Sequence, residues 1–175
     1  MGDSAMWVAA FTGGTAVLAS WVTNLGNVRA ARAQAEASTQ AQHRGRVREL
    51  RRAAYLDLMQ RSHETAELYR NVSDAFHETP DPRQQLARLE ELRVELRGAY
   101  ARLMHSVRVV ALEGPATTAD AAQTVQDAAL RANQSLWHIT RGDTDARAHF
   151  DAAQTAYRQS QARFVERARA ATEAS

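Results

Sequence analysis

The nearest match to a catalytic motif in this chain is a histidine followed by acidic residues at helical spacing. His63-Glu64-Thr65-Ala66-Glu67 is close to a metalloprotease helix, but Glu67 stands where the second histidine ligand of H-E-x-x-H belongs. Asp74-Ala75-Phe76-His77 imitates half of a di-metal site in a helical bundle, but the sequence contains no Glu-x-x-His to complete it. We therefore expect the His63–Glu67 segment to be a solvated polar face and the Asp74–His77 segment not to be half of a di-metal site. We expect no metal, no cofactor and no catalytic residue.

Other residues with chemical potential also lack their partners. The chain has no cysteine, which excludes disulfides, thiolate nucleophiles and Cys-based metal sites. Gly13-Gly14 lacks the lysine of a phosphate loop, and His105 and His138 have no serine elbow nearby. Arg141-Gly142-Asp143 spells an adhesion tripeptide, but a turn and a helix cap explain it more simply. The sequence therefore favours a non-enzymatic protein.

One charge feature rises above the background. Residues 29–52 hold seven arginines against two glutamates, whereas the rest of the chain is slightly acidic. We expect lipid-headgroup contact from Arg44, Arg46, Arg48, Arg51 and Arg52. Such basic segments gain about 1 kcal/mol per arginine near an anionic membrane surface. An ordinary solvated helix is the alternative, and nucleic acid is disfavoured because no aromatic residues alternate with the arginines.

The element that would hold these arginines at a membrane is the uncharged run of residues 4–28. As a helix it would be about 37 Å long, which is enough to span a bilayer. Two tryptophans lie near its ends, and the small-residue pairs Ala9/Gly13 and Ala10/Gly14 have the four-residue spacing that lets membrane helices approach closely. The residues expected to form the span are Trp7, Phe11, Gly13, Gly14, Val17, Leu18 and Trp21.

Two other interpretations of this run remain open, a cleaved signal peptide and an apolar helix buried in a soluble core or oligomer. Asp3 precedes the run where a signal peptide would carry positive charge. Every arginine follows it, so the positive-inside rule predicts a single-pass protein of the cell membrane with its N-terminus outside and the remainder cytoplasmic.

The remainder predicts a stalk and a bundle. Residues 29–46 are rich in helix formers but poor in large apolar side chains, which indicates a solvated helix or an alanine-lined coiled coil. From Val47 onward, apolar residues recur at three- and four-residue steps along four segments. The segments are separated by His77–Pro82, by Gly114-Pro115, where we expect a left-handed glycine cap, and by Thr140–Asp143. A threonine hydroxyl of Thr117 or Thr118 should cap the third helix.

The apolar stripes define the expected core. They are Val47, Leu50, Ala54, Leu58, Thr65, Tyr69, Val72 and Phe76; Leu86, Leu89, Leu92, Leu96, Tyr100, Leu103, Val107 and Val110; Ala122, Val125, Ala129, Ala132, Leu136 and Ile139; and Ala146, Phe150, Ala153, Tyr157, Phe164, Ala168 and Ala171. Four similar helices with short connections predict an antiparallel bundle. Because alanine buries little area, we expect added surface from a second copy or an unidentified protein partner.

The order of these features carries a resemblance. Arg51-Arg52-Ala53-Ala54-Tyr55-Leu56 opens one helix, and Val109-Val110-Ala111-Leu112-Glu113-Gly114-Pro115 precedes another. With the N-terminal span and the Ala/Gln/Arg stalk, the chain resembles a group of small actinobacterial, N-terminally membrane-anchored helical proteins over roughly residues 5–135. The resemblance implies this architecture and carries over no catalytic residue.

The predicted protein is therefore all-α, with an N-terminal transmembrane helix (residues 1–28), a helical stalk (29–46) and an antiparallel four-helix bundle (47–175). The leading hypothesis is a membrane-anchored interaction module, a scaffold, adaptor or assembly component, that acts through protein–protein association and forms a homo-oligomer. The alternative is a membrane-active, holin-like or toxin component whose N-terminal helices form a lesion.

Overall fold

The computed structural model describes the backbone of residues 3–143 and 145–173, and within those ranges the side chains from residue 34 onward. This part of the chain is all-α, as predicted, and has no strand. Its four helices are α1 (Asp3–Glu78), α2 (Pro82–Glu113), α3 (Ala116–Thr140) and α4 (Ala146–Glu173). The chain divides into two units, residues 1–46 and 47–175.

In the first unit, the described side chains belong to the predicted stalk, where residues 34–44 are all exposed. The hydroxyls of Ser38 and Thr39 donate to the backbone carbonyl of Ala35, at 2.8 and 2.9 Å. Among the residues with described side chains, no helix is both long and apolar enough to cross a membrane. The predicted span lies outside these residues, with Trp7, Phe11, Gly13, Gly14, Val17, Leu18 and Trp21.

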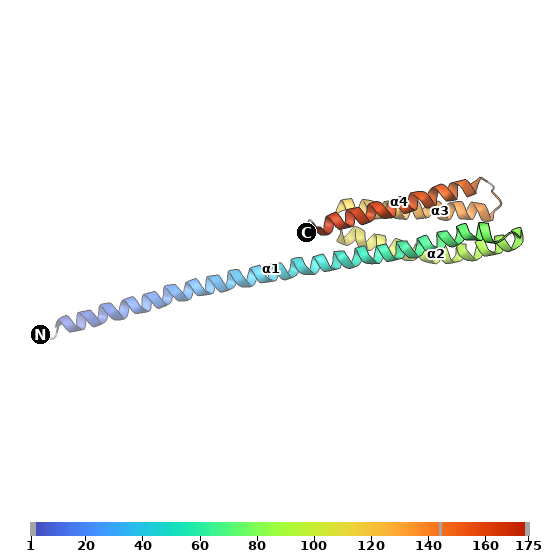
Figure 1. Cartoon of the computed structure of the whole chain (residues 1–175). Coiled ribbons are helices and arrows are strands. Elements are labelled where there is room, and N and C mark those ends of the chain that lie inside the picture. Colours follow the sequence, from blue (N-terminus) through green and yellow to red (C-terminus); the bar gives the residue numbers. More distant parts are fainter. Residues whose placement is uncertain (1–2, 144, 174–175) are drawn as a thin grey trace. The chain divides into compact units, whose positions relative to one another are not determined.

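The second unit is a helical bundle formed by α2, α3, α4 and the part of α1 after Arg46. Successive helices run in opposite directions (Figure 1). The α1–α2 turn follows the predicted proline signal: Pro82 is the first residue of α2, and the Asp81 carboxylate accepts from the backbone N–H of Arg83 at 2.9 Å. The Gln85 amide lies 3.2 Å from the Thr79 carbonyl, so it helps to satisfy the end of α1.

The core is built from the predicted stripes. Tyr69 lies at its centre, with its ring 5.9 Å from the ring of Phe150 and 5.3 Å from that of Tyr157, both edge-on. The Tyr69 hydroxyl donates to the carbonyl of Ala129 at 2.9 Å, and the Tyr157 hydroxyl donates to that of Ser62 at 3.0 Å. Small residues on α3 and α4 therefore leave room for large rings, and the alanine-rich stripes are buried within the chain itself.

Most stripe positions are buried, but those at the helix ends are not. Leu50 and Leu86, predicted to be core residues, are exposed. The Arg51 guanidinium donates to the carbonyl of Glu113, the last residue of α2, at 2.7 Å. Leu50 therefore lies level with the end of α2 and has no further turn of that helix to pack against. Leu86 lies in the second turn of α2, close to the end of the bundle.

Two predicted caps were wrong. Gly114 is extended, with φ −92° and ψ 165°, rather than left-handed. Glycine is needed there for close packing, because a Cβ would lie 2.9 Å from the Val110 carbonyl oxygen and 3.1 Å from the Tyr55 hydroxyl. The first residue before α3 is Pro115, and no side chain caps this helix. The Thr118 hydroxyl is instead buried and has no hydrogen-bond partner among the described residues.

Candidate functional site

The largest aromatic side chain exposed on the bundle lies in a groove between α2 and α3. Trp137 is 42% exposed, and Leu130, two turns earlier on the same face of α3, is 40% exposed. The wall on α2 contains Leu96 and Tyr100, and the groove has a volume of about 220 Å³. Large apolar groups left in solvent beside a concave surface are typical of a protein-binding site.

Positive charge surrounds this groove. Arg93 and Arg97 line it from α2, and the Arg141 guanidinium lies 5.0 Å from the centre of the Trp137 ring. Arg93 is neutralised by Glu90, at 2.6 Å, whereas Arg97 makes no ion pair with the residues that the structure describes. No acidic side chain lines this part of the described surface. The groove therefore combines apolar contacts with an unbalanced positive rim.

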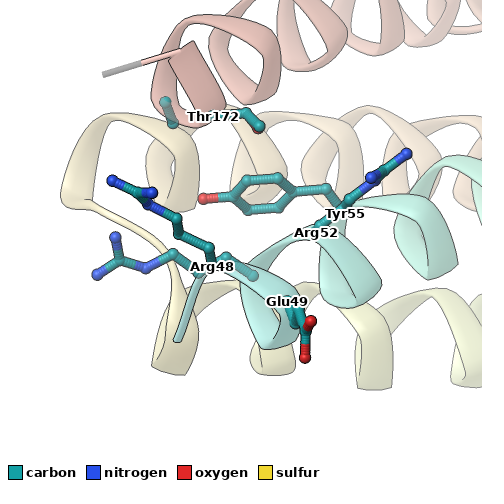
Figure 2. Close-up of a pocket in the computed structure, with 7 residues that line it drawn as sticks. Arg48, Glu49, Arg52, Tyr55 and Thr172 are labelled. Atoms are coloured by element: carbon teal, nitrogen blue, oxygen red, sulfur yellow. The ribbon is translucent and has the colours of Figure 1, made fainter. Parts of the chain in front are cut away.

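The sequence-predicted arginines divide between the two units. Arg44 and Arg46 are exposed residues of the first unit. Arg48, Arg51 and Arg52 belong to the bundle, where they line a second pocket of about 200 Å³ together with Tyr55. In Figure 2 the Tyr55 hydroxyl points toward the side of the pocket occupied by Arg48.

The pocket brings together residues of α1 and α4. Thr172, in the last turn of α4, faces the Tyr55 ring in Figure 2, while the Glu49 carboxylate is directed away from it. The Arg51 side chain is held by its hydrogen bond to the Glu113 carbonyl. Tyr55 is 3% exposed, and its hydroxyl has no hydrogen-bond partner among the described residues. Sequence reasoning identified the arginines but missed Tyr55 as part of their site.

The motif tested for metal chemistry forms surface ion pairs. His63 is exposed, and its Nε2 lies 3.6 Å from a carboxylate oxygen of Glu67. The Arg61 guanidinium lies 3.2 Å from Glu64, and its hydrogen bonds lower the pKa of that carboxyl. Among the described residues, no three histidine or carboxylate side chains gather closely enough to hold a metal ion.

The remaining candidates lie on the surface of the bundle. His105 and His138 are exposed, and His138 Nδ1 is 3.9 Å from the Asp143 carboxylate. Arg141-Gly142-Asp143 forms the expected turn, with Gly142 at φ +89° and the Asp143 carboxylate accepting from the backbone N–H of Asp145 at 3.1 Å.

Three comparisons with known proteins found no match for this chain. No protein-family model, curated protein or solved structure matches it. Its function is therefore inferred from the chemistry of its own residues.

Proposed function

We propose that this chain is a membrane-anchored, non-enzymatic helical interaction module that acts through protein–protein association. The observation that carries the proposal is the α2–α3 groove, where Leu130 and Trp137 of α3 remain exposed beside Leu96 and Tyr100 of α2. Tryptophan in a concave apolar site is a frequent anchor of protein interfaces. The alanine-rich stripes are covered inside the chain, so this groove, rather than an incomplete core, supports the expectation of a partner.

The partner that fits the groove is an amphipathic helix with acidic flanks. The groove follows two antiparallel helices, and its exposed apolar side chains are spaced by seven residues on α3, which suits the apolar face of a third helix. The guanidinium of Arg97 has no counter-charge among the described residues, so glutamates or aspartates beside that apolar face would pair with it. A basic helix would be repelled from the same rim.

Anchoring and self-association complete the proposal and rest on the sequence. The uncharged residues 4–28 would span the membrane, with the bundle on the cytoplasmic side. Close helix approach at Gly13 and Gly14 would bring copies together, and the stalks would then lie in parallel. Headgroup contact by Arg44 and Arg46 would hold the stalk near the membrane surface.

The docking proposal is tested with a designed peptide and full-length protein in detergent micelles. The acidic peptide has leucines at positions i, i+3, i+4 and i+7, glutamate flanks and a fluorescein label. A second labelled peptide has the same leucines and lysine flanks. We expect saturable binding of the acidic peptide only, and a loss of roughly tenfold or more in affinity for Trp137→Glu, since buried aromatic anchors contribute about 2 kcal/mol or more. Fluorescence anisotropy reports the affinity.

The matched control is Val165→Glu, because Val165 is 45% exposed but lies on α4, outside the groove. This variant should bind the acidic peptide like the unmodified protein. Equal binding of both peptides, or an equal loss in both variants, would show that association is nonspecific and would contradict the docking site.

A further inference from the structure

The pocket lined by Arg48, Arg51 and Tyr55 differs in kind from the α2–α3 groove. Its arginines and its tyrosine come from one face of α1, because positions 48, 51, 52 and 55 are spaced by three, four and seven residues. The hydroxyl of Thr172, on α4, already donates to the Ala168 carbonyl at 2.8 Å. Guanidinium and phenol groups can all donate hydrogen bonds, and a guanidinium cannot accept one. The acidic residue of the lining, Glu49, points away from the Tyr55 ring (Figure 2). The pocket is therefore a cluster of donors.

Tyr55 supplies an independent indication of a ligand. Tyr55 is only 3% exposed, yet its hydroxyl makes no hydrogen bond with any described residue. Buried hydroxyls in folded proteins nearly always have a partner. The other two buried tyrosine hydroxyls that lie deep in this bundle, on Tyr69 and Tyr157, each donate to a carbonyl. The Tyr55 hydroxyl instead points toward the arginine side of the pocket (Figure 2).

The geometry of Arg51 shows how the cluster is fixed. Its Nε donates to the Glu113 carbonyl at 2.7 Å, which holds the guanidinium at the end of α2 and leaves the terminal nitrogens for another acceptor. Arg48 is exposed and has no ion-pair partner among the described residues. Because the Tyr55 hydroxyl oxygen is covered, part of the pocket wall must shift before a ligand reaches it, and Arg48 is an exposed side chain of that wall.

We propose that Arg48, Arg51 and the Tyr55 hydroxyl bind a phosphate group. A phosphate offers several oxygens to donors that approach from different directions, and arginine is well suited to such an acceptor. The pocket volume of about 200 Å³ is smaller than the sites that hold drug-sized ligands, which favours a compact group. The phosphate belongs either to a small soluble compound or to an anionic lipid headgroup. This assignment is independent of the α2–α3 groove.

The test compares both sources of phosphate with full-length protein in dodecyl maltoside micelles at constant ionic strength. One arm titrates inorganic phosphate, and the other adds dioctanoyl phosphatidic acid, with dioctanoyl phosphatidylcholine as the neutral lipid. Isothermal titration calorimetry measures both. We expect saturable binding in at least one arm: binding of inorganic phosphate identifies a soluble source, and binding of phosphatidic acid alone identifies a lipid headgroup.

Variants separate the site from general charge. Arg48→Gln and Tyr55→Phe should each weaken phosphate binding by roughly tenfold to a hundredfold, the range expected for loss of one hydrogen bond to a charged group. Arg158→Gln removes the same charge from an exposed position in the middle of α4 and should change affinity less than twofold. Without phosphate, Tyr55→Phe should melt at the temperature of the unmodified protein or higher, because its hydroxyl makes no internal hydrogen bond.

Three results would overturn the proposal. They are the absence of saturable binding in both arms, unchanged affinity in Arg48→Gln and Tyr55→Phe, and a loss in Arg158→Gln as large as that in Arg48→Gln.

Discussion

At the scale of single residues, the stability of the bundle depends on two tyrosine hydroxyls that are buried in its core. Burial raises the pKa of Tyr69 well above its usual range and raises that of Tyr157 as well. Each neutral hydroxyl donates to a main-chain carbonyl of another helix, which an ionised tyrosine could not do. The folded state therefore requires both side chains to keep their protons.

This requirement predicts a loss of stability in alkaline solution. Tyrosines of the unfolded chain titrate near pH ~10, below the raised pKa values of the folded protein. The stabilising effect is thus complete below pH ~10 and declines as the pH rises above it, because the unfolded chain then releases protons that the folded chain retains. Urea unfolding between pH 8 and pH 11.5 should show the free energy of unfolding falling over the upper part of that range.

Tyr157→Phe provides the comparison for this prediction. Loss of the hydrogen bond to Ser62 should lower the free energy of unfolding by about 1 kcal/mol at pH 8. The variant should then lose less stability than the unmodified protein between pH 10 and pH 11.5. Parallel pH curves for the two proteins would mean that Tyr157 does not contribute to the alkaline transition.

The candidate site shows which residues a sequence pattern can identify. The charge imbalance before residue 53 pointed to Arg48, Arg51 and Arg52, because clusters of one sign are visible without a structure. Tyr55 was predicted neither in the apolar stripe nor in the arginine cluster, and its ring lies in the core, 6.2 Å from that of Phe164. Its spacing from Arg48 and Arg51 was the available signal. That its hydroxyl lacks a partner depends on the fold.

At the scale of the helices, the interior of each stripe was predictable and the ends were not. Periodicity placed Leu92, Val125 and Phe150 in the core because it reports which face of a helix is apolar. It does not report where the neighbouring helix stops, so Leu50 and Leu86 were wrongly assigned to the core. The α2–α3 groove was missed for the same reason, since its walls come from two helices whose pairing no local pattern encodes.

We expect replacement of glycine by alanine to have opposite effects at Gly98, inside α2, and at Gly114, directly after its C-terminal end. Gly114→Ala would bring a Cβ against the Val110 carbonyl and the Tyr55 hydroxyl, and should cost about 1–3 kcal/mol of stability. Gly98→Ala lies inside the helix, where the nearest atom would be 3.6 Å away on the flexible Arg102 side chain. It should stabilise the protein by about 0.5–1 kcal/mol, because alanine favours helix over glycine.

Thermal unfolding of both variants measures these signs. In Gly114→Ala/Tyr55→Phe, removal of the hydroxyl should recover part of the lost stability, while the contact with the Val110 carbonyl persists. Equal effects of the two single alanine substitutions would show that Gly114 is not held in a close contact.

At the scale of the whole molecule, the proposed anchor gives the most direct prediction. Full-length protein should fractionate with membranes and resist carbonate extraction, whereas a chain that starts at Arg44 should be recovered in the soluble fraction. A reporter fused after Ser175 should be active in the cytoplasm, since every arginine follows residues 4–28. Full-length protein in the soluble fraction, or a reporter active outside, would contradict the anchor or its orientation. Lysis on expression would favour the holin-like alternative.

Tyr69 has a further consequence for how the bundle opens. The Tyr69 side chain of α1 hydrogen-bonds to α3 and packs against two rings of α4. Detachment of either α3 or α4 therefore disturbs the contact that Tyr69 makes with the other helix. If α4 alone unfolded, the Tyr69 phenol would stay against α3 and would be exposed to solvent on the side that α4 covers. The amide groups at the centres of α1, α3 and α4 should consequently share one opening event, which makes these helices a single cooperative unit in hydrogen exchange.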